Sequence, residues 1–219
     1  KLSNAKPNFM SLSFESEDDS VVVLVKYMIA SGKKKLYRSD IRYTIFADGA
    51  ISVLTNLARE PFSDKDIPRF GITLELPPEH KYVEYYGRGE KENLCDINRH
   101  ALIGVYKSTV EEMHEPYILP QDNGNHGGTK YLKITNKDGK GVEFVAHPKF
   151  SFSVHNYTQD SLVKAQHRED LKDENTTFVS IDGFHRGAGT NSCGPDTLEK
   201  YRFVFDYEIK FKFTIKPIV

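Results

Sequence analysis

The sequence predicts an all-β protein, a large antiparallel β-sandwich with at most one or two short helices. Apolar and polar residues alternate with period two in several segments, and Asp-Gly turns separate some of these segments. Phe and Tyr contribute 14 and 12 residues and Trp none, and such aromatic residues favour half-buried, pleated surfaces. A helix would spread the alternating residues around its whole circumference, so period two indicates strands with one buried face.

The C-terminal segment 201–216 is the clearest element. Its odd positions, from Tyr201 to Ile215, are all apolar or aromatic, whereas its even positions are polar except for Val204. This alternation predicts one long strand, or a pair of strands, with one buried face.

Two hairpins are predicted around Asp-Gly turns, because Asp-Gly supplies the positive φ angles that tight turns need. The first turn is Asp48-Gly49, between strands 37–46 and 50–57; the second lies within 137–141, between strands 131–135 and 142–145. Further strands are expected at 20–28, 72–76, 82–86, 150–155 and 177–182, and one helix from Thr158, its N-cap, to His167.

Composition favours one domain over residues 1–219, with no linker or repeat. The formal net charge of −1 argues against a nucleic-acid partner. The longest apolar run, 21–25, is far shorter than a membrane span of about 18 residues, so no membrane partner is expected. Cys95 and Cys193 cannot form a disulfide framework, which favours the cytoplasm, with the periplasm as the alternative.

Three loops, 87–93, 120–128 and 183–195, are richer in glycine and polar residues than turns require, and function on a β-sandwich usually lies in its loops. The histidines lack metal-ligand spacing, and Gly187-Ala-Gly189 lacks the helix of a dinucleotide site. Glycoside hydrolysis needs two carboxylates about 5–10 Å apart, which a sequence does not establish. The residues alone therefore favour binding over catalysis, with no catalytic or metal-binding residue assigned.

The loop motifs carry a family resemblance. Gly87-Arg-Gly-x-x-Glu92-Asn93-x-x-Asp96 resembles the Gly-Arg-Gly-Pro-x-Glu-Asn-Tyr-x-Asp stretch in the C-terminal "small chain" domain of family 2 β-galactosidases. The likeness is dense and colinear from about residue 82 to 201, and only a strand pattern matches before residue 80. Further motifs follow in the family's order: Pro120-Gln-Asp-Asn-Gly124, Phe150-Ser-Phe-Ser153, Ile181-Asp-Gly-Phe-His185 and Gly187-x-Gly189-x-x-Ser192.

The resemblance implies a galactose mutarotase-like supersandwich, of which this chain would be the C-terminal three-quarters. It implies an accessory domain of an enzyme that hydrolyses terminal β-D-galactosides such as lactose. The catalytic glutamates and the magnesium of that family lie on a (β/α)8 barrel absent from these residues, so no cofactor is expected here. The expected partners are that barrel, a β-galactoside on its aglycone side, and further copies of a homo-oligomeric parent enzyme.

The resemblance also assigns site residues. The last loop supplies the substrate-binding candidates Asn191, Ser192 and Cys193, and Cys193 stands where many members carry a tryptophan that stacks on the sugar. Glu90 and Leu94 likewise replace the usual proline and tyrosine of the first loop.

The other matched loop residues are expected to shape the loops. Arg88 would pair with Glu92 or Asp122 to tether two loops, and asparagines would satisfy the backbone of tight turns. The two glycines of the last loop, Gly187 and Gly189, lack a Cβ and would let the backbone approach the barrel or a sugar closely. The full loop-shaping set is Arg88, Glu92, Asn93, Asp122, Asn123, His185, Gly187 and Gly189.

Two other functions remain open. One is a stand-alone carbohydrate-binding sandwich. The other is a mutarotase-like epimerase, for which His185 with Glu92 or Asp122 is the candidate acid–base set. A domain that lacks its opening strands is also expected to expose a sheet edge, which invites pairing with a second copy.

Overall fold

The computed structural model describes residues 4–61, 63–187 and 196–219. Within this part of the chain, eleven antiparallel strands form one sheet in the order β1-β2-β3-β4-β11-β9-β8-β6-β7, and β10 pairs with both β5 and β9. The all-β antiparallel prediction is confirmed. The strands are β1 (Lys6–Glu17), β2 (Ser20–Ser31), β3 (Lys34–Phe46), β4 (Ile51–Arg59), β5 (Arg69–Leu76), β6 (Tyr82–Gly89), β7 (Leu102–Thr109), β8 (His126–Thr135), β9 (Gly141–His155), β10 (Thr177–His185) and β11 (Glu208–Ile218).

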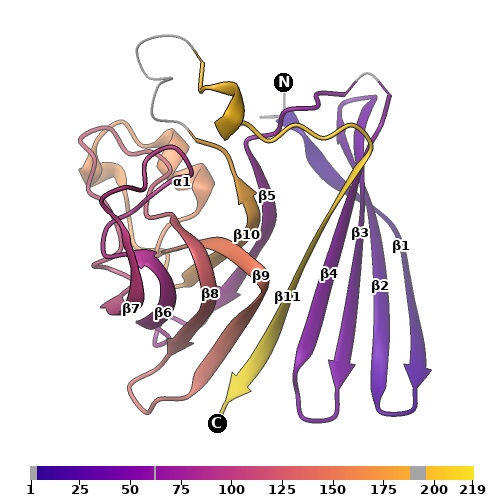
Figure 1. Ribbon diagram of the computed structural model, residues 1–219, viewed down its shortest axis with the longest axis horizontal. Helices are drawn as coiled ribbons and strands as arrows, with labels where there is room; N and C mark the ends of the chain where they lie inside the picture. The colour runs from indigo at the N-terminus through magenta and orange to yellow at the C-terminus, as the bar shows by residue number, and fades with distance from the viewer. Residues whose placement is uncertain (1–3, 62, 188–195) are drawn as a thin grey trace.

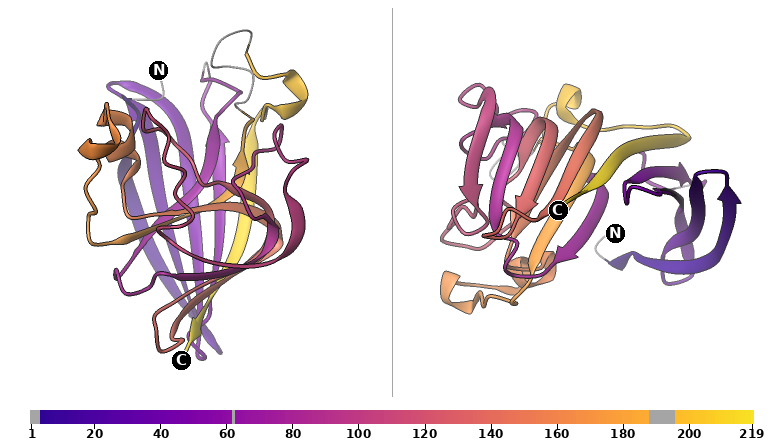
Figure 2. Two further views of the ribbon diagram at one scale, coloured as in Figure 1. Left: turned by 90° about the vertical axis from the view of Figure 1, so that its left-hand side faces the viewer. Right: turned by 90° about the horizontal axis from the view of Figure 1, so that it is seen from below.

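The sheet is strongly curved, so that β1–β4 and β6–β9 lie in different planes (Figures 1 and 2). The core lies on its inner face. Val53 pairs across the strands with Phe213, and Phe144 with Leu132, and all four side chains are at most 1% exposed. Burial of such apolar surface contributes about 25 cal/mol per Å², so the inner face of the central strands dominates the stability of the fold.

The predicted turns are present, and the helix predicted from Thr158 is present but ends at Lys164, before His167. Gly49 and Gly139 have φ angles of 83° and 78° in the β3–β4 and β8–β9 turns. Helix α1 (Gln159–Lys164) begins after the predicted N-cap Thr158, whose hydroxyl accepts a hydrogen bond from Ser161 N at 3.1 Å. Two 3₁₀ turns, η2 (Arg168–Asp170) and η3 (Glu199–Tyr201), complete the described helical segments. No helix among the described residues is long and apolar enough to cross a membrane.

The C-terminal strand is shorter than predicted, because β11 begins only at Glu208. Its partner β4 ends at Arg59, so no ladder is available to the preceding residues. They bond instead to the β4–β5 connection: Phe205 N donates to Lys65 O at 3.1 Å, and Val204 forms an isolated bridge. Phe205 is nevertheless buried, so the alternation marks an inward-facing side without marking a continuous strand.

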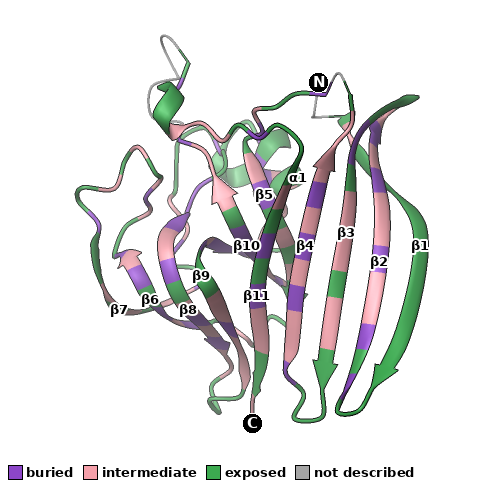
Figure 3. Ribbon diagram, turned by 45° about the vertical axis from the view of Figure 1, so that its right-hand side comes forward, coloured by how far each residue is buried: buried purple, intermediate pink, exposed green. Residues whose placement is uncertain are grey.

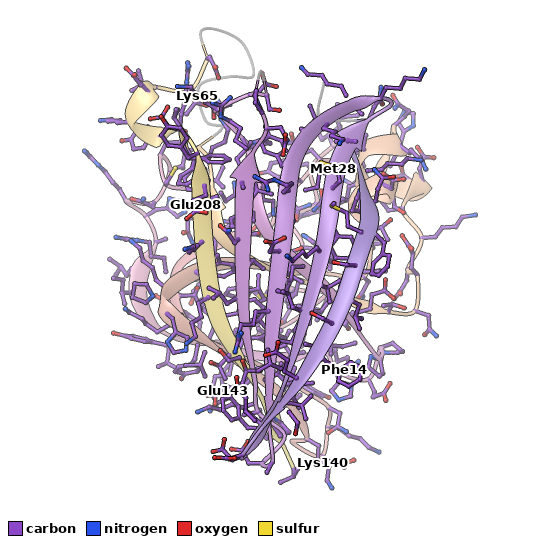
Figure 4. All side chains as sticks on the ribbon, turned by 90° about the vertical axis from the view of Figure 1, so that its right-hand side faces the viewer. Phe14, Met28, Lys65, Lys140, Glu143 and Glu208 are labelled. Carbon is purple, nitrogen blue, oxygen red and sulfur yellow. The ribbon has the colours of Figure 1, made fainter. Side chains whose placement is uncertain are left out.

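Strands β1 and β7, the two edges of the main strand order, are absent from the predicted set. In β1 the cause is a bulge at Met10, where the register with β2 shifts between Phe9 and Ser11. Phe9 and Phe14 lie on the same face although their positions differ in parity, so the alternation in the sequence is broken. All twelve residues of β1 are exposed, and Figure 3 shows the strand at the margin of the molecule; Phe14 on this strand is labelled in Figure 4.

Candidate functional site

The three glycine-rich loops singled out by their composition meet around one pocket. We define the loop cluster as residues 87–96, 120–128 and 183–187, the last being the described part of the third loop. The pocket has a volume of about 350 Å³, and its wall includes Arg88, Asn93, Gly127 and His185. Segments separated by roughly a hundred positions in the sequence are thus brought together by the fold.

Asn93 joins the first two loops. Its side chain is buried, its Nδ2 donates to Arg88 O and Lys91 O at 3.2 Å each, and its Oδ1 accepts from Gly127 N at 3.0 Å. Its backbone adds two links to Asn125, one from Asn93 N to Asn125 O at 2.7 Å and one from Asn125 Nδ2 to Asn93 O at 2.6 Å. These bonds are the kind expected of an asparagine that satisfies the backbone of a tight turn.

Asn123 has the same role in the second loop. Its buried amide accepts from Glu115 N at 3.0 Å through Oδ1 and donates to Gln121 O at 2.9 Å through Nδ2. Each amide therefore bonds with both its donor and its acceptor, as burial of a polar group requires.

Glu92 ties the loops differently from the predicted ion pair with Arg88. Its Oε2 accepts from Gly124 N at 2.7 Å, and its Oε1 accepts from the Tyr117 hydroxyl. That hydrogen bond, together with burial, raises the pKa of Tyr117 to about 12.

Arg88 instead donates from Nη1 to Ala101 O at 3.0 Å. The predicted pairing of Arg88 with Glu92 or Asp122 is wrong, because both carboxylates are engaged by other donors.

The donors to Asp122 form a second cluster at the ends of β5 and β10. His185 Nε2 lies 3.1 Å from Asp122 Oδ2, and Arg69 Nη1 lies 3.4 Å from Asp122 Oδ1. Arg69 also donates from Nε to Asp182 Oδ2 at 2.7 Å and from Nη2 to Ser153 Oγ at 3.1 Å. One guanidinium therefore joins the second loop to strands β9 and β10.

The two carboxyl groups of this cluster have opposite pKa shifts. Burial raises the pKa of Asp182, whose side chain is only 3% exposed, in spite of the neighbouring Arg69. At Asp122 burial acts in the same direction, but the hydrogen bond from His185 and the charge of Arg69 outweigh it and hold the pKa well below its usual range. Asp122 is therefore a stable carboxylate and a weak base.

Beneath the second loop lies a pair of histidines, of which His155 is buried and His114 half-buried. His155 donates from Nε2 to Asn123 O, at 3.0 Å, and its ring meets the His114 ring edge-on at 6.0 Å between centroids. Burial lowers the pKa of His155 to about 4 and also lowers that of His114. Both rings are thus neutral near pH 7.

The third loop approaches the first at Gly187. A Cβ at this position would lie 2.3 Å from the Asp96 carboxyl carbon, so any larger residue here would displace the Asp96 side chain. The neighbour of Gly187 in the structure is therefore a side chain of this chain, and the expected approach of this glycine to the barrel or to a sugar stays a prediction. Gly189 and the substrate-binding candidates Asn191, Ser192 and Cys193 lie outside the described residues.

Sequence reasoning missed Arg69, Asp182 and His155. Asp182 carried a usable signal, since a charged residue within an apolar strand must be paired when buried. Its partner Arg69 lies 113 positions away, and the cross-strand register that joins them is not legible in the sequence. Among the described residues, no group of three or more His, Cys, Asp or Glu side chains could hold a metal ion.

Comparison with solved structures finds a galactose mutarotase related enzyme from Lactobacillus acidophilus, at 11% identity and a TM-score of 0.47. The match covers 96% of this chain and 72% of that one.

Among curated proteins, the β-galactosidase of Actinobacillus pleuropneumoniae is 36% identical over 205 residues, and that of Staphylococcus xylosus 29% over 203. These alignments cover 93% and 92% of this chain but only 20% of each relative, so the chain spans about a fifth of their length. The sequence profile of the family described as beta galactosidase small chain matches residues 2–215. The chain therefore belongs to the β-galactosidase small-chain family.

Proposed function

We propose that this chain is the accessory small-chain domain of a larger β-galactosidase and that its loop cluster completes the aglycone side of the galactoside site. The family match over residues 2–215 supports this, as does the chain's share of about a fifth of its curated relatives. In this proposal residues 1–219 form one sandwich domain, and the partners are the barrel domain, a β-galactoside and further copies of the parent enzyme.

The observation that carries the proposal is the convergence of the three loops. Asn93 and Glu92 hold the first two loops together through buried or backbone-directed hydrogen bonds, and Asp122 and His185 connect the second to the third. Loops fixed in this way present a preorganised surface, which a composite site needs because ordering on binding would weaken it.

Two carboxylates of the loop cluster, Glu92 and Asp122, are committed to structure. Glu92 is bonded to Tyr117 and Gly124, and Asp122 is bonded to His185, Arg69 and Gln159. Retaining glycoside hydrolysis needs one carboxyl group as acid and a second free as nucleophile. We therefore assign the catalytic pair to the remainder of the parent enzyme.

The test is hydrolysis of a chromogenic galactoside by three samples: the pure chain, the A. pleuropneumoniae relative truncated to remove its matching fifth, and their mixture. The expected result is no turnover by the chain and a gain on mixing that saturates with added chain. Turnover by the chain alone, or a mixture no more active than the truncated enzyme, would contradict the proposal.

One contact favours a second function, a mutarotase-like epimerase. His185 and Asp122 lie 3.1 Å apart, as the candidate acid–base set requires. The depressed pKa of Asp122 makes it a poor proton acceptor, however, and both of its oxygens are occupied. A polarimetric time course of α-galactose with the chain decides: a rate above the spontaneous one would restore this function.

A further inference from the structure

The pocket between the three loops has a polar wall whose hydrogen-bonding capacity is only partly used. Asn93 and His185 are fully engaged within the protein. By contrast, Asn125 is 6% exposed, and its Oδ1 has no hydrogen-bond partner among the described residues. Its Nδ2 is held by Asn93 O, which fixes the orientation of the amide and leaves this oxygen as the spare acceptor.

Two cations line the same pocket, Arg88 and Lys149. Arg88 is half-buried and donates from Nη1 to Ala101 O, which leaves the other nitrogens of its fork for a ligand. Lys149 is exposed. Within the described residues neither cation forms a salt bridge to a carboxylate, whereas Arg69 and Arg186 each pair with two carboxylates.

The described lining of this pocket contains no Asp or Glu. A second pocket of about 580 Å³ beside β6 and β7 has three carboxylates, Glu90, Glu112 and Glu115, and two lysines, Lys91 and Lys107, in its wall. An anion is therefore favoured at the first pocket over the second.

The pocket wall also contains an aromatic side chain against which the apolar face of a sugar ring can pack. Phe184 is half-buried in the pocket wall, and its ring packs against the ring of Phe203 at 4.2 Å between centroids. The ring is therefore fixed in orientation and partly accessible. A volume near 350 Å³ is at the small end of ligand pockets, which is the size for a single sugar ring rather than an extended oligosaccharide.

We propose that this pocket binds a saccharide unit carrying an anionic group, a carboxylate or a sulfate. Arg88 and Lys149 take the anion through charge-assisted hydrogen bonds, and the apolar face of the sugar lies toward Phe184. The saccharide part rests on the proposed function, because it takes the ligand class from the galactosidase family. The anionic part rests on the pocket's own charge.

The experiment is calorimetric titration of the intact chain with D-galacturonate, D-galactose and inorganic sulfate at low and moderate salt. The expected result is saturable binding of galacturonate that weakens with salt, with galactose and sulfate each bound at least about tenfold more weakly. Equal affinity for galactose and galacturonate would overturn the anionic part. Sulfate binding as tight as that of galacturonate would show a free-anion site and overturn the saccharide part, and no saturable galacturonate binding would overturn both.

Variants locate the binding. Lys149→Gln removes an exposed charge and should weaken galacturonate binding about tenfold, the value of one charge-assisted hydrogen bond. The matched control is Lys140→Gln, in the turn between β8 and β9 (labelled in Figure 4), whereas Gly128 of the pocket wall lies near the start of β8. Arg88→Gln should weaken binding as well, with its thermal unfolding measured because Arg88 also supports Ala101.

Unchanged affinity in folded Lys149→Gln would overturn the assignment of the site. These titrations use the chain alone, so their result can be told apart from that of the mixing assay. A mixture without added activity would contradict the proposed function and leave the measured galacturonate affinity unchanged. Absence of galacturonate binding would contradict the present inference and leave the result of the mixing assay unchanged.

Discussion

The loop cluster and the edge strand β1 contain the same kinds of side chain in opposite surroundings. Phe152, beneath the loop cluster, is fully buried and stacks on the His126 ring at 5.3 Å, whereas Phe14 on β1 is 74% exposed. Asn93 is buried with every polar atom bonded, whereas the Asn8 amide of β1 only caps nearby carbonyls at 3.2–3.3 Å. The residue type determines which interactions a side chain can make, and its position in the fold determines how much these interactions contribute to stability.

The largest difference is expected between two phenylalanine truncations. Phe152→Ala removes a ring packed between Tyr85 and His126 and should lower the free energy of unfolding by about 4 kcal/mol. Phe14→Ala should change it by less than about 0.5 kcal/mol, because the ring meets water in both states. Urea unfolding of both variants measures the difference, and a cost of more than about 2 kcal/mol for Phe14→Ala would show that β1 is covered in solution.

A matched pair of amide variants probes the polar side of the same comparison. Asn93→Ala leaves Gly127 N and two carbonyls without their partners and should cost about 2–3 kcal/mol. Asn8→Ala should cost under about 0.5 kcal/mol, since water replaces its bonds. Amide hydrogen exchange adds a local readout: in Asn93→Ala the protection of Gly127 should fall before global unfolding. Equal costs for the two variants would mean that the loop cluster is not a rigid unit.

The two regions should also contribute differently to the pH dependence of stability. Strand β1 has no buried titratable group, whereas the loop cluster covers His155. The folded-state pKa of His155 is about 4 against an ordinary 6.5, since burial disfavours the charged ring. Between these values the unfolded chain binds a proton that the folded chain does not, so stability falls as pH falls through this window. At pH 5 the loss attributable to His155 is about 2 kcal/mol.

The variant His155→Gln keeps a donor toward Asn123 O and removes the titration. Its free energy of unfolding should fall less than that of the unmodified chain between pH 7.5 and pH 5. Some dependence should remain, because the pKa of His114 is lowered in the same direction. His167→Gln, at a ring that is 76% exposed, is the control and should keep the full dependence. An unchanged pH profile in His155→Gln would contradict the buried neutral ring.

Sequence reasoning reached the parts of this molecule in which local pattern and tertiary role agree. The turn glycines, the Thr158 cap and the buried amide Asn93 were predicted because turns and caps depend on neighbours in sequence. It failed where a distant partner decides. The segment before Glu208 alternates like a strand, but β4 ends too early to pair with it. Arg88 was expected to bind Glu92 or Asp122. Glu92 is occupied by Tyr117 and Gly124, and Asp122 by His185 and Arg69.

The smallest effect on stability, and a distinct effect on association, is expected at β1. Among the described residues this edge strand pairs only with β2, which leaves its outer backbone edge unpaired there, and Phe9, Leu12 and Phe14 share one exposed apolar face. Unpaired edges of this kind template pairing with another chain unless a charge or a bulge blocks them. The Met10 bulge interrupts only one point of β1, so the run from Ser11 to Glu17 stays available for pairing.

Sedimentation velocity should therefore show reversible self-association of the chain as its concentration rises to about 100 µM. Leu12→Lys places a charge on the exposed apolar face and should abolish this association, while the free energy of unfolding stays within about 0.5 kcal/mol of the unmodified value. The same substitution type at Val163, exposed on α1, is the control and should leave association intact. A clean monomer at the highest concentration would mean that the bulge and the acidic end of β1 suffice to protect the edge. Strand β1 and the loop cluster would then differ only in how tightly their side chains are packed and not in their tendency to associate with a second chain.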